Sequence, residues 1–225
     1  MKRLAILTVL LVAALGVAHA QSSVELEEVS LERFEIEGAW YSSISGDNGF
    51  TVSRLFPGGP AGREPIPGEN EADVQDENVL GVRVDFIRRG FHNFTVTPVR
   101  PIPVDGIAKT VSVWVAGRNA NHELRLLVRD IRGRTHSIYM GDLNFQGWRQ
   151  LTAVIPAQGV DGRSGVVQRN HTNTSIRPGI EVMGFRVNTD PVDSVGSYYI
   201  YFDDLRVVRD MFALGRDEDD PADGW

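Results

Sequence analysis

The sequence predicts an all-β protein, and three features indicate that class. Apolar and polar residues alternate with a period of two along most of the chain, as they do in strands with one buried face. Gly, Pro and Asp residues separate these segments, and almost no stretch has a convincing helical period. One domain of about 200 residues is a normal size for a β-sandwich.

Ten segments have the strand pattern. They are Val29–Ile36, Gly49–Leu55, Val79–Phe86, Phe91–Thr97, Ile107–Val115, Glu123–Val128, Thr135–Met140, Arg149–Ile155, Ile180–Val187 and Tyr198–Val207. The turn residues Asp130 to Gly133 predict a hairpin between the sixth and seventh segments. Two loops, 57–78 and 157–179, are long and polar, so we expect them to lie unburied on the surface.

Residues 1–20 have the pattern of a secretory signal peptide. Lys2 and Arg3 precede an apolar run that is shorter than the roughly 18 to 20 residues of a membrane anchor, and the small residues of an A-x-A site end at Ala20. We expect cleavage after Ala20 and an exported protein with no membrane insertion. The predicted organisation is a signal peptide at 1–20, a β-sandwich domain at 21–210 and an acidic C-terminal tail at 211–225.

The composition excludes several classes of protein and site. The chain has no cysteine, so it forms neither a disulfide nor a thiolate metal site. Without Lys2 and Arg3, 21 basic side chains face 30 acidic ones, a formal charge of −9 that argues against a nucleic-acid partner.

The charges are unevenly placed along the chain, which suggests assembly between copies. Acidic residues and one tryptophan lie in the tail, while arginines lie in and around the central strands. The candidate interface residues are Arg118, Arg125, Arg129, Arg132, Arg134 and Arg149 in the body, and Asp217, Asp219, Asp220 and Trp225 in the tail. We expect the tail to meet the body of a neighbouring copy. The alternative is a tail that contacts nothing.

No catalytic residues are assigned, because the usual enzyme motifs are missing. The sequence has no G-x-S-x-G and no H-E-x-x-H, and its histidines are scattered over predicted strands and loops. Asp203 and Asp204 lie within the apolar segment "YIYFDDLRVV". On a regular strand they point to opposite faces, so they cannot act together on one substrate atom. An acid in such a place needs hydrogen bonds or a metal.

The segments "RFEIEGAW", "SVWVAGRN", "LNFQGWRQLTAVIP" and "YYIYFDDLRVV" resemble the jelly-roll β-sandwich of carbohydrate-binding modules and galactose-binding-like domains. In some such modules an acid from the first strand and one from the last hold a buried structural calcium. The resemblance implies Glu35, Asp203 and Asp204 as its candidate ligands, and no other cofactor. Structural hydrogen bonding without metal is the alternative.

A second resemblance is more specific. "VLGVRVDF", "VWVAGRN" and Met140-Gly141 followed by "FQGWRQ" are similar to the outer-layer (sheath) protein of the spirochaete periplasmic flagellar filament, the FlaA family, over about residues 79–208. It implies a non-catalytic subunit in the periplasm that coats the flagellin core together with other sheath subunits, in a homo- or hetero-assembly. It also implies an effect on filament stiffness, shape and motility.

The alternative function is an exported protein like a carbohydrate-binding module. Trp40, Tyr41, Trp114 or Trp148 would then offer flat faces to a glycan. Aromatic residues on strands more often pack in the core, which is what we expect of Trp114 and Trp148. A glycoside hydrolase would need two facing carboxylates, and no strand pattern offers them.

Overall fold

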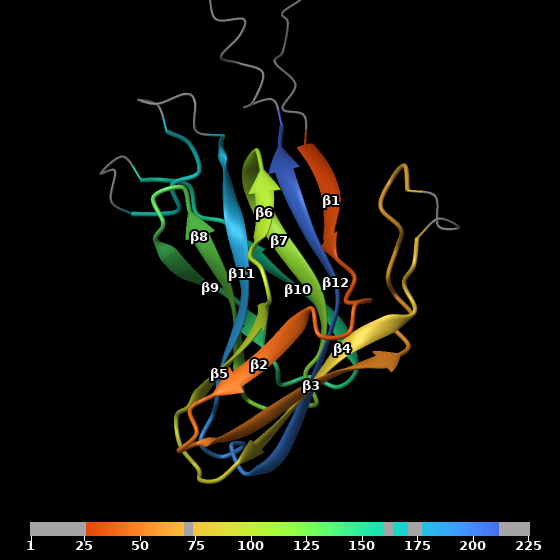
Figure 1. Cartoon of the computed structure of the whole chain (residues 1–225), viewed down its shortest axis with the longest axis vertical. Coiled ribbons are helices and arrows are strands. Elements are labelled where there is room, and N and C mark those ends of the chain that lie inside the picture. The colour runs from red at the N-terminus through yellow and green to blue at the C-terminus, as the bar shows by residue number, and fades with distance from the viewer. Residues whose placement is uncertain (1–25, 70–73, 160–163, 171–176, 212–225) are drawn as a thin grey trace, which may run out of the picture.

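The computed structural model describes residues 26–69, 74–159, 164–170 and 177–211, which form a sandwich of two antiparallel β-sheets (Figure 1). The described strands lie between Leu26 and Asp210, inside the predicted 21–210 domain. The predicted signal peptide, its cleavage site and residues 212–225 of the tail lie outside the described residues. Within the described ranges no helix is long and apolar enough to cross a bilayer.

The first sheet, here called sheet A, has the strand order β10-β7-β12-β4-β3, and β1 also pairs with β12. Its strands are β1 (Leu26–Glu32), β3 (Gly49–Pro57), β4 (Asn78–Phe86), β7 (Ile107–Ala116), β10 (Trp148–Val154) and β12 (Gly196–Asp210). The long strand β12 pairs with β4 through Gly196–Phe202 and with β1 through Leu205–Asp210. Two shorter strands therefore follow one another along the same side of β12.

The second sheet, sheet B, repeats this arrangement. Its order is β2-β5-β11-β8-β9, and β6 pairs with β11 beyond the end of β5. Its strands are β2 (Trp40–Ile44), β5 (Asn93–Pro98), β6 (Ile102–Asp105), β8 (Glu123–Asp130), β9 (Thr135–Asp142) and β11 (Gly179–Asn188). Each sheet is thus built on one long central strand.

The core lies between the sheets and follows from the alternation in the sequence. On β12, Tyr198, Ile200 and Phe202 are buried, whereas Tyr199 faces away from the core and is exposed. The Phe202 ring stacks on Phe185 of β11 with ring centroids 4.9 Å apart, and thus joins the two sheets. Burying such a ring stabilises the fold by a few kcal/mol, about 1.5 to 3 for a phenylalanine.

All ten predicted strands are present, and the predicted hairpin between β8 and β9 is confirmed. The first strand ends at Glu32 rather than at Ile36. Phe34 has a φ of 58°, and the amides of Arg33 and Phe34 donate to the Glu32 carboxylate at 3.0 and 2.8 Å, so the chain leaves the sheet here. The strands β2 and β6 were not predicted, because both are short.

The two long loops differ from the prediction that they lie unburied, because parts of both pack against the sandwich. In the first loop Ile66 is buried, and in the second Val166, Val167 and Gln168 are buried. The Gln168 side chain accepts from the amide of Ala108 at 2.8 Å and donates to its carbonyl at 2.9 Å. The loop thus supplies the hydrogen bonds that a strand neighbour would otherwise give to this backbone.

Candidate functional site

Asp203 and Asp204 lie where β12 is irregular. The register between β12 and β7 shifts between Asp203 and Arg206, and Asp204 has a φ of 48°. The expectation of regular strand alternation is therefore wrong at this point, because a bulge interrupts it. Both side chains are fully buried.

Arginines neutralise one oxygen of each aspartate. Arg206 donates to Asp204 Oδ2 from Nε and Nη2, both at 2.7 Å. Arg63 reaches Asp203 Oδ2 at 3.4 Å and also pairs with Asp76. Burial, and then the charge of Asp76, raises the pKa of Asp203 to about 7, against the opposing effect of Arg63. The remaining oxygens, Asp203 Oδ1 and Asp204 Oδ1, have no hydrogen-bond partner among the described residues.

The charged cluster consists of Arg63, Asp76, Asp203, Asp204 and Arg206. It holds the loop after β3 over the outer face of β12. Arg206 Nη2 donates to the Glu64 carbonyl at 2.5 Å, and Arg33 pairs with Glu69 and Asp76. The loop also brings Gly62 close to the ring of Trp114. A polar cleft of about 370 Å³ remains between the loop and the sheet. The cluster therefore acts as a structural clamp.

The expected calcium ligands do not gather in this cluster. Glu35 Oε1 accepts from the amides of Glu77 and Asn78 at 2.7 and 2.8 Å, and its Oε2 accepts from Asn78 Nδ2 at 2.7 Å. Glu35 thus holds the start of β4. No group of three His, Asp or Glu side chains suited to an ion occurs among the described residues. Two aspartates beside two arginines do not fit a calcium site without a further ligand.

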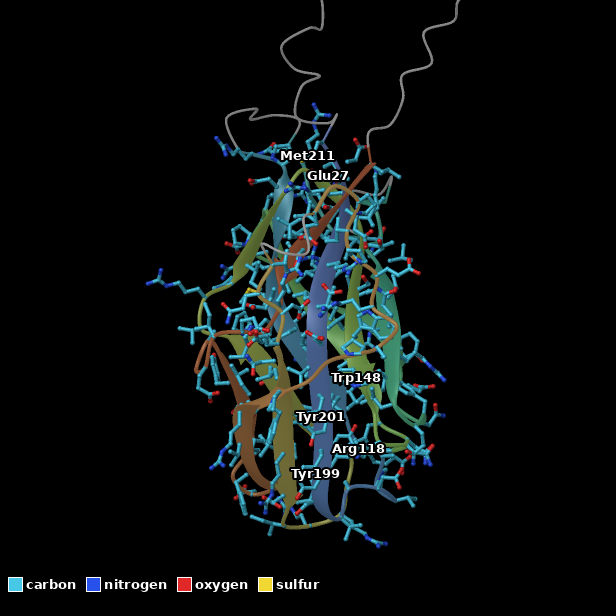
Figure 2. All side chains as sticks on the ribbon, turned by 90° about the vertical axis from the view of Figure 1, so that its right-hand side faces the viewer. Glu27, Arg118, Trp148, Tyr199, Tyr201 and Met211 are labelled. Atoms are coloured by element: carbon cyan, nitrogen blue, oxygen red, sulfur yellow. The ribbon has the colours of Figure 1, made fainter. Side chains whose placement is uncertain are left out.

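Beyond the loop, no described segment covers the outer face of sheet A, and this face carries aromatic side chains. The strand register places Trp148, Ala116, Tyr201, Gly81 and Arg54 in one row across β10, β7, β12, β4 and β3. The next row contains Tyr199, Arg83 and Val52. In Figure 2, Trp148 of β10 and Arg118, which follows β7, lie beside the part of β12 that carries Tyr199 and Tyr201.

Two adjoining hollows lie on this face, with volumes of about 330 and 590 Å³. Phe56 and Tyr201 border both of them. Their rings meet nearly edge-on, with centroids 5.8 Å apart and planes inclined by 73°. We call the two hollows the aromatic groove, and its main lining side chains are Arg54, Phe56, Arg118, Trp148, Tyr199 and Tyr201.

Gly81 forms the floor of the aromatic groove. A Cβ atom there would lie 2.5 Å from the Phe56 ring and 3.0 Å from the Tyr201 ring. The missing side chain lets Phe56 lie across β4 and reach Tyr201. This groove was not predicted, although the alternation around Tyr199 and Tyr201 indicates that these two aromatic side chains point to the same outer face.

The six candidate arginines do not form one surface. Arg125 pairs with Glu123 at 2.9 Å and Arg129 with Glu181 at 2.5 Å, all within sheet B. The amides of Arg132 and Arg134 donate to Asp130 in the β8–β9 turn. The tail residues Asp217, Asp219, Asp220 and Trp225 lie outside the described residues.

Arg118 and Arg149 lie over aromatic rings. The Arg118 guanidinium carbon is 5.1 Å from the centre of the Tyr201 ring, and that of Arg149 is 4.3 Å from the centre of Phe145. Among the described residues, no side-chain hydrogen bond or ion pair is found for Arg118, Arg149 or Arg54. Of the six candidates, only Arg118 lines the aromatic groove.

The aromatic residues considered for glycan binding are dispersed. Trp40 is buried and packs on Phe34 and Phe185, which is a core role. Trp114 and Trp148 are half-buried on the outer face of sheet A, so the expectation of pure core packing does not hold for them. Tyr41 is 52% exposed on β2 of the other sheet.

The described histidines serve the backbone or the turns. His122 is buried, accepts from the amide of Asp190 at 3.1 Å, and has its pKa lowered by burial. His136 contacts Asp130 at 2.8 Å in the hairpin turn.

Comparison with solved structures finds carbohydrate-binding modules. TmCBM61 in complex with β-1,4-galactotriose gives a TM-score of 0.43 at 12% identity, covering 81% of this chain and 99% of that one. The family 11 module of a Clostridium thermocellum cellulase gives 0.42 at 11% identity, covering 81% and 95%. These values are too low to carry an argument about ligands.

Comparison with sequences identifies relatives in spirochaetes. A flagellar filament outer layer-like protein of Brachyspira hyodysenteriae is 37% identical over 196 residues, covering 87% of this chain and 85% of the relative. The flagellar filament outer layer protein of Treponema pallidum is 31% identical over 109 residues, which span 48% of this chain and 31% of that protein. That of Spirochaeta aurantia is 26% identical over 178 residues and is covered to 53%.

The family model described as flagellar filament outer layer protein FlaA matches residues 6–218. This range includes the segments "VWVAGRN" and "FQGWRQ" and confirms the resemblance seen in the sequence. The chain belongs to the FlaA family of flagellar filament outer layer proteins.

Proposed function

We propose that this protein is a non-catalytic structural subunit of the outer layer of periplasmic flagella. It is exported to the periplasm, coats the flagellin core beside other sheath subunits, and contributes to the stiffness, shape and motility of the filament. The observation that carries the proposal is the family match over residues 6–218.

The architecture supports this role. Each sheet has one long central strand paired on both sides, and ring stacking such as that of Phe185 on Phe202 joins the sheets. The charged cluster clamps the longest described loop segment onto sheet A. A subunit built in this way resists deformation, and many modest contacts between such subunits add up to a stable layer.

Carbohydrate binding is the weaker candidate. Flat sugar rings are usually held against exposed aromatic faces, but Phe56 and Tyr201 meet edge-on and Trp40 is buried. Arg118 already lies over the Tyr201 ring. The groove also carries arginines that a neutral glycan does not require.

The test is cryo-electron tomography of cells that contain or lack this protein. We expect filaments from the deletion strain to be thinner and less stiff, and complementation to restore both properties. Gold-labelled antibody should mark the protein along periplasmic filaments. A protein that fractionates away from filaments, with an unchanged filament diameter in the deletion strain, would contradict the proposal.

A further inference from the structure

We propose that the aromatic groove receives the acidic segment Asp217–Trp225 of a second copy of this chain, so that copies associate end to end. This inference rests on the proposed function and specifies one of the contacts that hold the layer together. It involves Arg54, Phe56, Tyr199 and Tyr201, which were not among the candidate interface residues.

The chemistry of the groove matches that segment. Phe56 and Tyr199 are each 42% exposed, so the groove offers apolar surface in water. Arg54 and Arg118 border it without an acidic partner among the described residues. The segment "DEDDPADGW" carries five acids and ends in an aromatic residue. Its carboxylates can pair with the arginines while its indole covers the apolar surface.

Other charges at the groove do not oppose this pairing. Arg83 Nη2 donates a hydrogen bond to the Asp85 carboxylate at 2.9 Å, and the Ser197 hydroxyl also donates to that carboxylate. These bonds keep the pKa of Asp85 below its usual range, so it remains charged and held in place. Glu37 accepts from the amide of Leu55 beside the groove, at 3.1 Å. The free positive charge therefore lies at Arg54 and Arg118.

Chain geometry favours a second copy over the same copy. Met211 lies near one end of the molecule, and Tyr201 lies well below it (Figure 2). Ten residues of β12 separate them, about 33 Å at the usual strand rise. Asp217 follows Met211 by six residues and can therefore be at most about 22 Å away from it. Asp217 thus falls short of its own Arg54 and Tyr201, which share one row of the sheet. Asp220, nine residues after Met211, reaches that row only if the chain is fully extended. A second copy can instead present its groove to the whole acidic run without stretching the chain.

A second copy that lies beyond the Met211 end of the sandwich can place its groove within reach of the tail of the first copy. The two contacting surfaces then differ, since one copy gives its tail and the next gives its groove. Contacts of this head-to-tail type continue into open rows instead of closing into a dimer. Open rows are what a layer along a filament requires.

The test is a charge exchange between full mature chains, followed by analytical ultracentrifugation at low salt. One variant carries Arg54→Glu and Arg118→Glu in the groove. The other carries Arg at positions 217 to 220 of the tail, through Asp217→Arg, Glu218→Arg, Asp219→Arg and Asp220→Arg, which leaves Asp223 as the one acid of that segment. Each variant alone should stay monomeric, because groove and tail then have charges of the same sign. Their mixture should associate as wild type does, since each groove then meets a tail of opposite sign. The association should weaken by at least tenfold between about 50 and 500 mM salt.

The matched control carries Arg89→Glu and Arg100→Glu, which make the same charge change at exposed positions outside the groove. It should associate as wild type does. Groove variants that associate like wild type, or a mixture that remains monomeric, would overturn the proposal. So would a groove that binds an oligosaccharide while self-association is unchanged. Failure of the proposed function looks different, because wild-type protein would then be missing from filaments altogether.

Discussion

The two halves of β12 have opposite outer surfaces. From Asp203 to Asp210 the outer face is charged, yet a loop and the clamp of Arg63 and Arg206 cover it. From Gly196 to Phe202 it carries two aromatic residues: Tyr199, which is 42% exposed, and Tyr201, which Phe56 and Arg118 cover only in part. Burial therefore does not follow polarity here. Charged groups are buried where they are paired, and apolar groups stay exposed where we propose that a second copy binds.

The largest expected effect in the covered half is that of Asp204→Ala. It leaves the buried Arg206 without its main partner, and it puts alanine at a positive φ. We expect a loss of about 3 to 5 kcal/mol in the free energy of unfolding. Asp204→Asn should lose less, because asparagine tolerates this backbone conformation and keeps one hydrogen bond. Urea titration measures both, and equal stability of Asp204→Ala and wild type would refute the clamp.

Gln168→Ala should have the next largest effect. It removes the side chain that pairs with both backbone groups of Ala108. We expect a loss of about 1 to 3 kcal/mol for leaving buried backbone groups unpaired. Gln158→Ala, in the same loop but with no such bonds, is the control and should change stability by less than about 0.5 kcal/mol. Similar losses in both variants would show that the loop contributes nothing specific.

Asp203→Asn should alter the pH dependence of stability. The pKa of Asp203 is raised to about 7 in the fold, so the native state binds its proton more tightly than the unfolded chain does. This contribution is fully present below the unfolded pKa and is lost as pH rises toward 7. Wild type should therefore lose more stability than Asp203→Asn between pH 4 and pH 8. Parallel melting curves for the two proteins across that range would contradict the assignment.

The smallest effect on stability is expected for Tyr199→Ala in the open half. Surface side chains usually contribute within about 0.5 kcal/mol, and a cross-strand pair such as Tyr199 with Arg83 adds at most about 1. The adjacent residue Tyr198 is buried and donates to the Gly117 carbonyl at 3.0 Å. Tyr198→Ala should cost about 3 to 5 kcal/mol. Thermal melting compares the two, and similar losses would remove the distinction between the two faces of the strand.

Much of the fold was readable from the sequence, because ten strands show regular alternation. The strands β2 and β6 were missed for physical reasons. Both are short, and β6 contains Pro103, which favours an edge position. The bulge at Asp204 also escaped prediction, since nothing in "FDDLR" marks a positive φ without a glycine.

The candidate site was predicted less well than the family. The motifs around Trp114 and Trp148 indicated FlaA correctly. Arg125 donates to Ser137 of β9 and Arg129 pairs with Glu181 of β11, and a single sequence does not reveal which strands are neighbours. The aromatic groove depends on three strands meeting at Gly81, so its parts are far apart in the chain.

The most direct test of the central claim is the extent of coating on filaments from cells that produce Arg54→Glu with Arg118→Glu. Cells producing Arg89→Glu with Arg100→Glu are the control. The account predicts that both proteins are exported and melt like wild type, that the control coats filaments fully, and that the groove variant leaves them largely bare in cryo-electron tomograms. Full coating by the groove variant would contradict it.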